Sequence, residues 1–319
     1  MKIRHKLGQL LKNSVMFNTF YNMGYKVTNG KKFFEMQEQR KGLSIFDYKN
    51  LSASIPYYPL EFVKDSNFYG HVYQLKRYAG VNKTDISIEH GLYYGSYIPY
   101  SSYCKTIRRI ATSSLVRKQV LERLGKPVIT LGPYIHYAPS LLDEKEITAI
   151  KAELGKTLLF FPKHTTIENA HVFSIDELIA SLKDFVQNQG FDTVLVCMYY
   201  YDILNSNYAM DYERAGFKVV TAGHRLDLNF LPRLKSIISI ADYTLANATG
   251  TQTGYCIYMN KPHSIICPVD YSTMPDDFKE ITRAFLKYSD CITEQQRALT
   301  SKYWGFNQIR TPEELYKLL

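Results

Sequence analysis

The chain lacks the sequence motifs of several large enzyme classes. It contains neither G-x-G-x-x-G nor G-x-x-x-x-G-K-[ST], which argues against dinucleotide-binding and P-loop folds. G-x-S-x-G is also missing, which argues against an α/β-hydrolase. There is no Asp-x-Asp triplet and no His/Cys/Asp cluster with ligand spacing. The sequence therefore predicts no metal site and no cofactor.

Cysteines are few, and long apolar runs are absent. The five cysteines are scattered without a C-x-x-C pair, which predicts reduced thiols rather than disulfides or zinc ligands. No run of about 18 apolar residues occurs, so we expect no transmembrane helix. Polar residues interrupt the apolar ones near the N-terminus, so we expect no signal peptide. These absences predict a cytoplasmic protein.

What the chain does have is an ordinary core composition and an excess of positive charge. It has 319 residues, 45% of them hydrophobic, and a net charge of +9, which favours phosphorylated, membrane or other acidic partners. Basic residues crowd the first 42 positions and predict weak contact with an anionic membrane, such as the inner face of the plasma membrane. A solvated helix face is the alternative. No nucleic-acid-binding module is recognisable, so we expect no nucleic-acid partner.

The second half of the chain alternates short apolar runs with amphipathic segments. We expect strands at 157–162, 193–199, 217–222, 242–246 and 263–267, and helices at 174–189, 205–215, 227–238 and 252–259. A helical tail over 275–319 follows, in which Thr311 and Pro312 open the last helix. Continuous apolar strands separated by helices predict a parallel sheet covered on both faces, as in a Rossmann-like domain.

The first half is less regular. Strands are expected at 43–47, 84–89 and 128–131, with helices near 59–65 and 114–124. We predict an α/β fold of two Rossmann-like domains that face a central cleft. The first domain spans residues 1–145 on the acceptor side. The second spans 146–319 and binds the nucleotide. Its last helix is a candidate to cross back to the first domain.

Small hydroxyl and glycine residues occupy the turn between the strand at 242–246 and the helix after it. The turn contains Thr249, Gly250, Thr251 and Thr253. Backbone N–H groups and the positive end of the helix dipole make such a turn a suitable phosphate-binding site. A helix cap without a ligand is the alternative reading.

Polar residues also follow three other strands. Glu89 and His90 follow the strand at 84–89, where either side chain can act as a general base. A histidine that only bonds loop backbone is the alternative.

The other two loops supply candidate donor-binding residues. The loop after 157–162 carries Lys163, His164, Thr165 and Glu168, which can bind phosphate or sugar hydroxyls. The loop after 217–222 carries His224 and Arg225; a pair between Arg225 and Asp227 is the alternative there.

These residues resemble motifs of two-domain GT-B glycosyltransferases of bacterial surface-polysaccharide synthesis. The chain looks most like the group of capsule Kdo transferases, sialyltransferases and CDP-glycerol glycerophosphotransferases. The matching segments are Glu89-His90-Gly91, Pro162-Lys163-His164 and residues 249–253. The chain departs from that pattern in His90, where the sialyltransferase-like pattern has a second acid, and in threonines where the family has paired serines. CMP-, CDP-, UDP- and GDP-linked donors therefore stay open.

The resemblance implies a metal-independent, inverting glycosyltransferase of capsule or lipopolysaccharide synthesis. It implies a nucleotide-sugar donor bound mainly by the second domain and a glycan or lipid-linked acceptor deprotonated by His90 or Glu89. Two alternatives stay open: a transferase of polyol phosphate from a CDP-linked donor, and a non-catalytic protein that binds a nucleotide or sugar.

Overall fold

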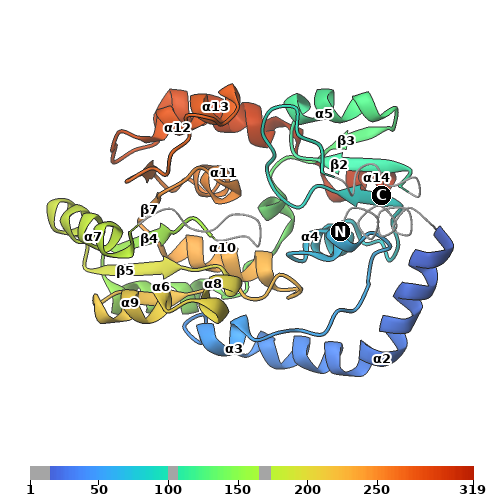
Figure 1. The fold of residues 1–319 in the computed structure, drawn as a ribbon, viewed down its shortest axis with the longest axis horizontal. Helices are drawn as coiled ribbons and strands as arrows, with labels where there is room; N and C mark the ends of the chain where they lie inside the picture. Colours follow the sequence, from blue (N-terminus) through green and yellow to red (C-terminus); the bar gives the residue numbers. More distant parts are fainter. Residues whose placement is uncertain (1–14, 100–106, 165–173) are drawn as a thin grey trace, which may run out of the picture.

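The fold is built on two parallel β-sheets. The computed structural model describes residues 15–99, 107–164 and 174–319. The first sheet has the order β1-β2-β3, and the second has the order β6-β5-β4-β7-β8. Every strand pair in these described ranges is parallel. With helices between the strands (Figure 1), this arrangement confirms the predicted α/β fold with Rossmann-like sheets.

The five-stranded sheet follows the predicted alternation closely. Its strands are β4 (Thr157–Phe161), β5 (Thr193–Cys197), β6 (Lys218–Val220), β7 (Tyr243–Ala246) and β8 (His263–Ile265). Its helices are α6 (Glu144–Leu154), α7 (Ile175–Gln189), α8 (Tyr200–Asn205), α9 (Tyr208–Arg214), α10 (Phe230–Ile240) and α11 (Thr251–Tyr258). The strand order reverses between β4 and β7, the point at which such sheets bind ligands.

One helix of this half differs from the prediction. The segment 205–215, expected as a single helix, contains the end of α8 and all of α9. Ser206 ends α8 in an extended conformation, and its hydroxyl donates to the Asp202 carbonyl at 2.7 Å. A side chain that bonds the backbone in this way competes with the helix, which explains the break.

The three-stranded sheet contains a strand that sequence patterning missed. Its strands are β1 (Ile86–Ile88), β2 (Arg109–Thr112) and β3 (Val128–Thr130). Its helical elements are α2 (Val15–Lys41), α3 (Tyr48–Ser52), η1 (Lys64–Asn67), α4 (His71–Ala79), α5 (Leu115–Leu121), η3 (Glu122–Leu124) and η4 (Tyr134–Tyr137). The central strand β2 is short and begins at an arginine, so it gives little apolar signal.

Two expected elements of the first half are wrong. Residues 43–47 form a turn rather than a strand, because the Asp47 side chain accepts from the Asn50 amide at 3.3 Å and caps α3. The helix expected near 59–65 is only the 3₁₀ turn η1. The α-helix of this region is α4, which begins after the left-handed Gly70.

The C-terminal helices connect the two sheets. They are α12 (Asp276–Phe285), α13 (Glu294–Trp304), η5 (Phe306–Gln308) and α14 (Pro312–Leu318). Thr311 and Glu314 form a capping box at the start of α14, which confirms the predicted helix start. Helix α14 lies against α4 beside the three-stranded sheet (Figure 1), and Arg109 Nη1 donates to the Leu318 carbonyl at 2.6 Å. The division into domains at residue 145 stays a prediction.

A continuous hydrophobic core runs through both sheets. One cluster of buried side chains includes Ile88 and Ala111 of the first sheet and Leu159 and Ala246 of the second. Trp304, at the end of α13, is 1% exposed and packs against Gly254 of α11. Its Nε1 donates to the Thr251 carbonyl at 3.0 Å. Trp304 therefore connects the end of α13 to the first turn of α11.

The described residues contain neither a membrane-spanning helix nor a metal-binding cluster. None of the helices there is long and apolar enough to cross a membrane. No group of three His, Cys, Asp or Glu side chains in the same ranges is placed to hold a metal ion. The free cysteines in those ranges are Cys197, Cys256, Cys267 and Cys291.

Candidate functional site

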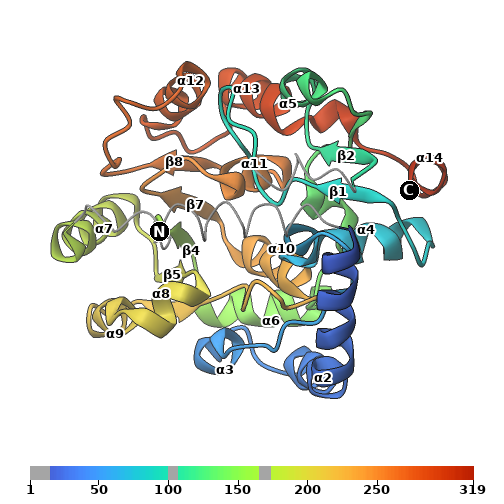
Figure 2. The ribbon, with the colours of Figure 1, turned by 45° about the vertical axis from the view of Figure 1, so that its right-hand side comes forward.

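The loops at the carboxyl ends of the two sheets meet. The Leu92 amide, in the loop after β1, donates to Thr251 Oγ1 at the start of α11, at 3.0 Å. A Cβ atom at Gly91 would lie 3.3 Å from the same oxygen, so the glycine allows this close approach. Figure 2 shows β1 and α11 next to each other. The loop that carries the predicted acceptor-side motif thus lies beside the predicted phosphate-binding turn.

Glu89 is held in a buried ion pair. Its carboxylate is 3% exposed and accepts from Arg117 Nη2 at 2.6 Å and from Arg117 Nε at 2.9 Å. Thr112 Oγ1 donates to it at 2.8 Å. Burial raises the pKa of Glu89, and the bonds from Arg117 and Thr112 oppose that shift. A carboxylate with these partners positions the loop and is poorly placed to remove a proton from a ligand.

His90 lies at the end of the same strand and is half-buried. Its ring packs edge-on against Phe68, with centroids 5.8 Å apart, and either ring nitrogen is 3.3 Å from the Tyr93 hydroxyl. Burial lowers the pKa of His90; the charge of Arg225 lowers it further, whereas Asp65 raises it. The imidazole is therefore neutral near pH 7 and able to accept a proton.

Two tyrosines connect His90 with His164. The Tyr69 ring lies 6.0 Å from the His90 ring, and its hydroxyl is 3.2 Å from the Tyr199 hydroxyl. The Tyr199 ring lies 4.8 Å from the His164 ring. Side chains that follow β1 and β4 thus belong to one cluster, because both strands point their carboxyl ends at it.

Sequence reasoning did not find either tyrosine. Tyr199 follows β5 by two residues, so the rule that ligands bind at strand ends could have found it. Tyr69 carries no local signal. Its backbone is left-handed, with φ 58°, and its amide donates to the Arg225 carbonyl at 2.6 Å. Non-glycine residues hold this conformation only when their surroundings impose it, and such residues gather at functional sites.

Arg225 supplies a positive charge to this cluster. Its guanidinium lies 4.7 Å from the centre of the Phe68 ring, a cation–π contact. Burial raises the pKa of Tyr199, and the Arg225 charge acts in the opposite direction. Within residues 15–99, 107–164 and 174–319, no carboxylate pairs with Arg225. Asp227, its expected alternative partner, pairs with Arg233 instead. The guanidinium is therefore available to an anion.

His224 has an internal role next to Arg225. Its Nδ1 accepts from the Leu226 amide at 3.2 Å, and its own amide donates to the Leu51 carbonyl at 3.0 Å. Burial, followed by the charges of Arg40 and Arg225, lowers the pKa of His224 to about 3. His224 is thus a neutral side chain that shapes the loop carrying Arg225.

The loop after β4 is tied to the loop after β7. The Lys163 amide donates to Asn247 Oδ1 at 2.6 Å, which spans the point where the strand order reverses. The side chains of Lys163 and His164 are exposed there. Thr165 and Glu168, predicted in the same loop, lie outside the described residues.

The threonines of the turn after β7 have different partners. Thr249 Oγ1 lies 2.7 Å from Thr282 Oγ1, and both residues are buried. Thr253 Oγ1 lies 3.3 Å from His263 Nε2 and accepts from the Gly250 amide at 3.4 Å. These two hydroxyls stabilise the turn from inside. Thr251, which contacts the loop after β1, and the first amides of α11 lie where the two loops meet.

The chain is distantly similar to solved structures. No protein-family model matches the chain, and no curated protein matches it in sequence. Among solved structures, the complex of S. aureus MnaA with UDP aligns with 85% of this chain and 84% of that one. The TM-score is 0.40 and the sequence identity 13%. The two parallel sheets themselves define the fold.

Proposed function

We propose that the protein is a metal-independent, inverting glycosyltransferase of the GT-B type. It transfers a sugar from a nucleotide-sugar donor to a hydroxyl of a glycan or lipid-linked acceptor. The observation that supports this most directly is the cluster of His90 and Arg225. A neutral imidazole after β1 and a guanidinium after β6 both contact the Phe68 ring, at 5.8 and 4.7 Å from its centre, and no carboxylate of the described residues pairs with the guanidinium.

Each step of such a transfer has a candidate residue. The acceptor oxygen attacks the anomeric carbon, and its proton passes to an imidazole nitrogen of His90. The bond between that carbon and the donor phosphate breaks, and negative charge develops on the departing nucleotide. Arg225, Lys163 and the first amides of α11 stabilise this charge. No metal is needed where cations and helix amides take that role.

The other predicted residues support these groups. Glu89 fixes the start of the His90 loop through Arg117, and His224 shapes the Arg225 loop. Thr249, Gly250 and Thr253 hold the turn before α11, while Thr251 and His164 lie near the donor phosphate in this proposal. A role in capsule or lipopolysaccharide synthesis follows from the motif resemblance alone and belongs to the proposal.

A screen of nucleotides tests the function. We expect one of CMP, CDP, UDP and GDP to raise the thermal midpoint, because a ligand of the native state at 100 times its Kd adds about 2.7 kcal/mol of stability. The matching nucleotide sugar should then be turned over with an acceptor panel. Turnover of CDP-glycerol instead would identify a polyol-phosphate transferase. Tight binding without turnover of any donor would identify a binding protein, and no binding at all would refute the proposal.

Arg225 gives a sharper test of the donor site. Replacing it with alanine removes charge-assisted hydrogen bonds to phosphate, so the affinity for the selected nucleotide should fall about 10- to 100-fold. Isothermal titration calorimetry measures the change. The matched control is Arg214→Ala on α9, where an exposed arginine pairs with Asp211 at the surface. Equal affinity of the two variants would exclude Arg225 from the donor site.

A further inference from the structure

Among the described residues, one side of helix α2 packs against the rest of the protein. Phe33, Gln37 and Arg40 are buried along its inner face. Gln37 Nε2 donates to the Leu226 carbonyl at 3.0 Å, and Arg40 Nη2 donates to the Ala53 carbonyl at 2.5 Å. Figures 1 and 2 show α2 at the outer edge of the molecule. Its opposite face is open to solvent.

That outer face carries an apolar stripe. Phe20 is 67% exposed and Val27 is 85% exposed. Met16, Met23 and Phe34 are also exposed, and the spacing of these five residues puts them on one side of the helix, opposite Phe33 and Arg40. We call these five residues the α2 stripe. A contiguous row of large exposed apolar side chains marks an interaction surface.

Up to Phe34, the last residue of the stripe, the sequence carries acidic or basic charge of one sign. Residues 1–34 contain no Asp or Glu; the first acid is Glu35. The same stretch contains seven basic residues, which are Lys2, Arg4, Lys6, Lys12, Lys26, Lys31 and Lys32. Two copies of the chain that paired through their stripes would bring these like charges together. An anionic partner fits the surface better.

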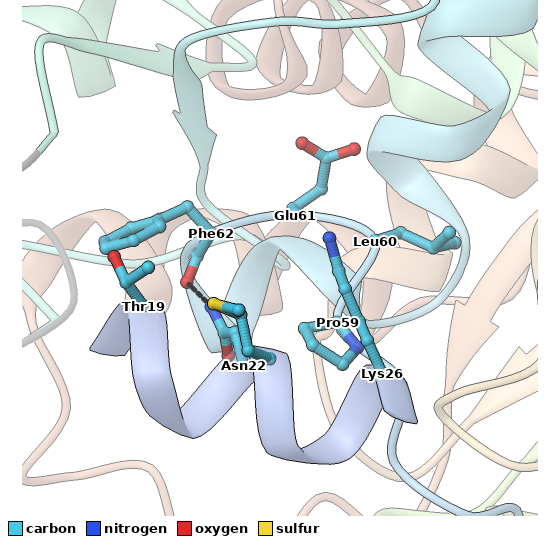
Figure 3. A pocket seen from close by; sticks show the side chains of 8 residues that line it. Thr19, Asn22, Lys26, Pro59, Leu60, Glu61 and Phe62 are labelled. Carbon is cyan, nitrogen blue, oxygen red and sulfur yellow. Dashed lines mark hydrogen bonds between the residues drawn. The ribbon is translucent and has the colours of Figure 1, made fainter. Parts of the chain in front are cut away.

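A shallow hollow beside the stripe widens the apolar surface. It has a volume of about 180 Å³ and lies between α2 and residues 59–62 (Figure 3). Asn22 Nδ2 donates to the Phe62 carbonyl at 3.2 Å and so holds the half-exposed Phe62 beside the helix. The acid at its rim, Glu61, is paired with Lys76 at 2.6 Å. Its charge is compensated and does not oppose an anionic surface.

We propose that the outer face of α2 docks on an anionic lipid bilayer. The helix lies in the plane of the interface, with the α2 stripe and Phe62 among the acyl chains and the lysines at the level of the headgroups. Phenylalanine and methionine on one side, with lysines in excess of acids, are the composition of helices that bind in this way. The acids of α2, Glu35 and Glu38, lie in its last two turns and pair with Lys31 and Lys41 at 3.9 and 2.6 Å. This inference is independent of the proposed enzymatic activity.

Vesicle flotation of the full chain tests the proposal. The probes are vesicles of phosphatidylcholine alone and vesicles with about one third phosphatidylglycerol. The wild-type protein should float with the anionic vesicles, and flotation should weaken as salt screens the lysines. The double variant Phe20→Ser/Val27→Ser should partition at least about tenfold more weakly, because it loses the apolar contact. Lys31→Glu/Lys32→Glu should weaken binding by a similar factor.

The matched control is Leu204→Ser/Met210→Ser, two exposed apolar residues on α8 and α9. It should float like the wild type, and thermal midpoints should show that all variants are folded. Unchanged flotation of the stripe variant would overturn the proposal. So would a wild-type dimer in analytical ultracentrifugation that binds no vesicles and that the stripe variant converts to a monomer, since that result would make a second copy the partner.

Discussion

Replacement of His90 by alanine is expected to lower kcat by about 10²- to 10⁴-fold, the range lost when a general base is removed. Nucleotide affinity should stay the same, because the donor phosphate is expected to bind Arg225, Lys163 and the start of α11. Steady-state kinetics with the donor identified by the screen, combined with calorimetry, measures both quantities. Retention of full kcat would remove His90 from the mechanism.

Two further variants make the result specific. His136→Ala removes another partly buried histidine that bonds Tyr258 at 2.6 Å outside the cluster, and it should keep near-normal kcat. Glu89→Gln weakens a buried ion pair with Arg117, so it should lower the thermal midpoint more than His90→Ala does. A large loss of kcat in Glu89→Gln with an unchanged midpoint would make Glu89 the better candidate for the base.

The pH profile gives a second readout of the same variant. The base must be neutral, and burial lowers the pKa of His90 from 6.5. The rate should therefore be constant around pH 7 and fall only as the pH drops through a value below 6.5, where the imidazole becomes protonated. This acidic limb should be missing from the residual activity of His90→Ala. Its persistence there would assign the limb to another group.

Replacement of Asp227 by alanine is expected to cost about 3–5 kcal/mol of unfolding free energy, the usual loss when one partner of a buried ion pair is removed. Asp227 and Arg233 are both fully buried, with Asp227 Oδ2 2.9 Å from Arg233 Nη1. Arg40 is a second buried arginine at 3.8 Å from the same oxygen. Without the carboxylate, two buried positive charges remain without an acid.

Urea unfolding measures this loss. The matched control is Asp211→Ala, which breaks an exposed pair with Arg214 and should cost less than about 1 kcal/mol. Similar losses in the two variants would show that the buried network adds no more than a surface pair. Asp227 Oδ1 also accepts from the Asn229 amide at 2.8 Å, so a partly folded Asp227→Ala protein should bind nucleotide weakly through a displaced Arg225 loop.

Sequence patterning predicted the five-stranded sheet well because its strands are continuous apolar runs. Residues 158–160, for example, are wholly buried in β4. The first half gave poorer predictions for physical reasons. Ile45 and Phe46 resemble a strand, but Asp47 caps a helix directly after them. Strand β2 has only four residues and begins at Arg109, whose charged side chain pairs with Asp85. The apolar run is therefore too short to indicate a strand.

The site was predictable where it depends on strand ends. His90, Lys163 and Arg225 each follow a strand, and a parallel sheet brings such residues to one edge. What the sequence could not show is which polar groups are already occupied. The bond of Glu89 to Arg117 joins residues that are far apart in the sequence, and the bond of Thr253 to His263 joins a helix to a strand. Tyr69 owes its position to a backbone bond from a loop more than a hundred residues away.

The return of α14 to the three-stranded sheet affects the order in which the chain assembles during synthesis. Leu315 is wholly buried in the core beside α4, and Gln308 Oε1 accepts from Thr130 Oγ1 of β3 at 2.7 Å. The strands β4 to β8, in contrast, all lie within residues 157–265. Domains usually fold in the order of their synthesis. The strands of the first sheet lie within residues 86–130 and are made first, but α14, which packs beside them, follows all the strands of both sheets. The first sheet therefore completes its packing only when α14 has left the ribosome, after the strands of the second sheet have emerged.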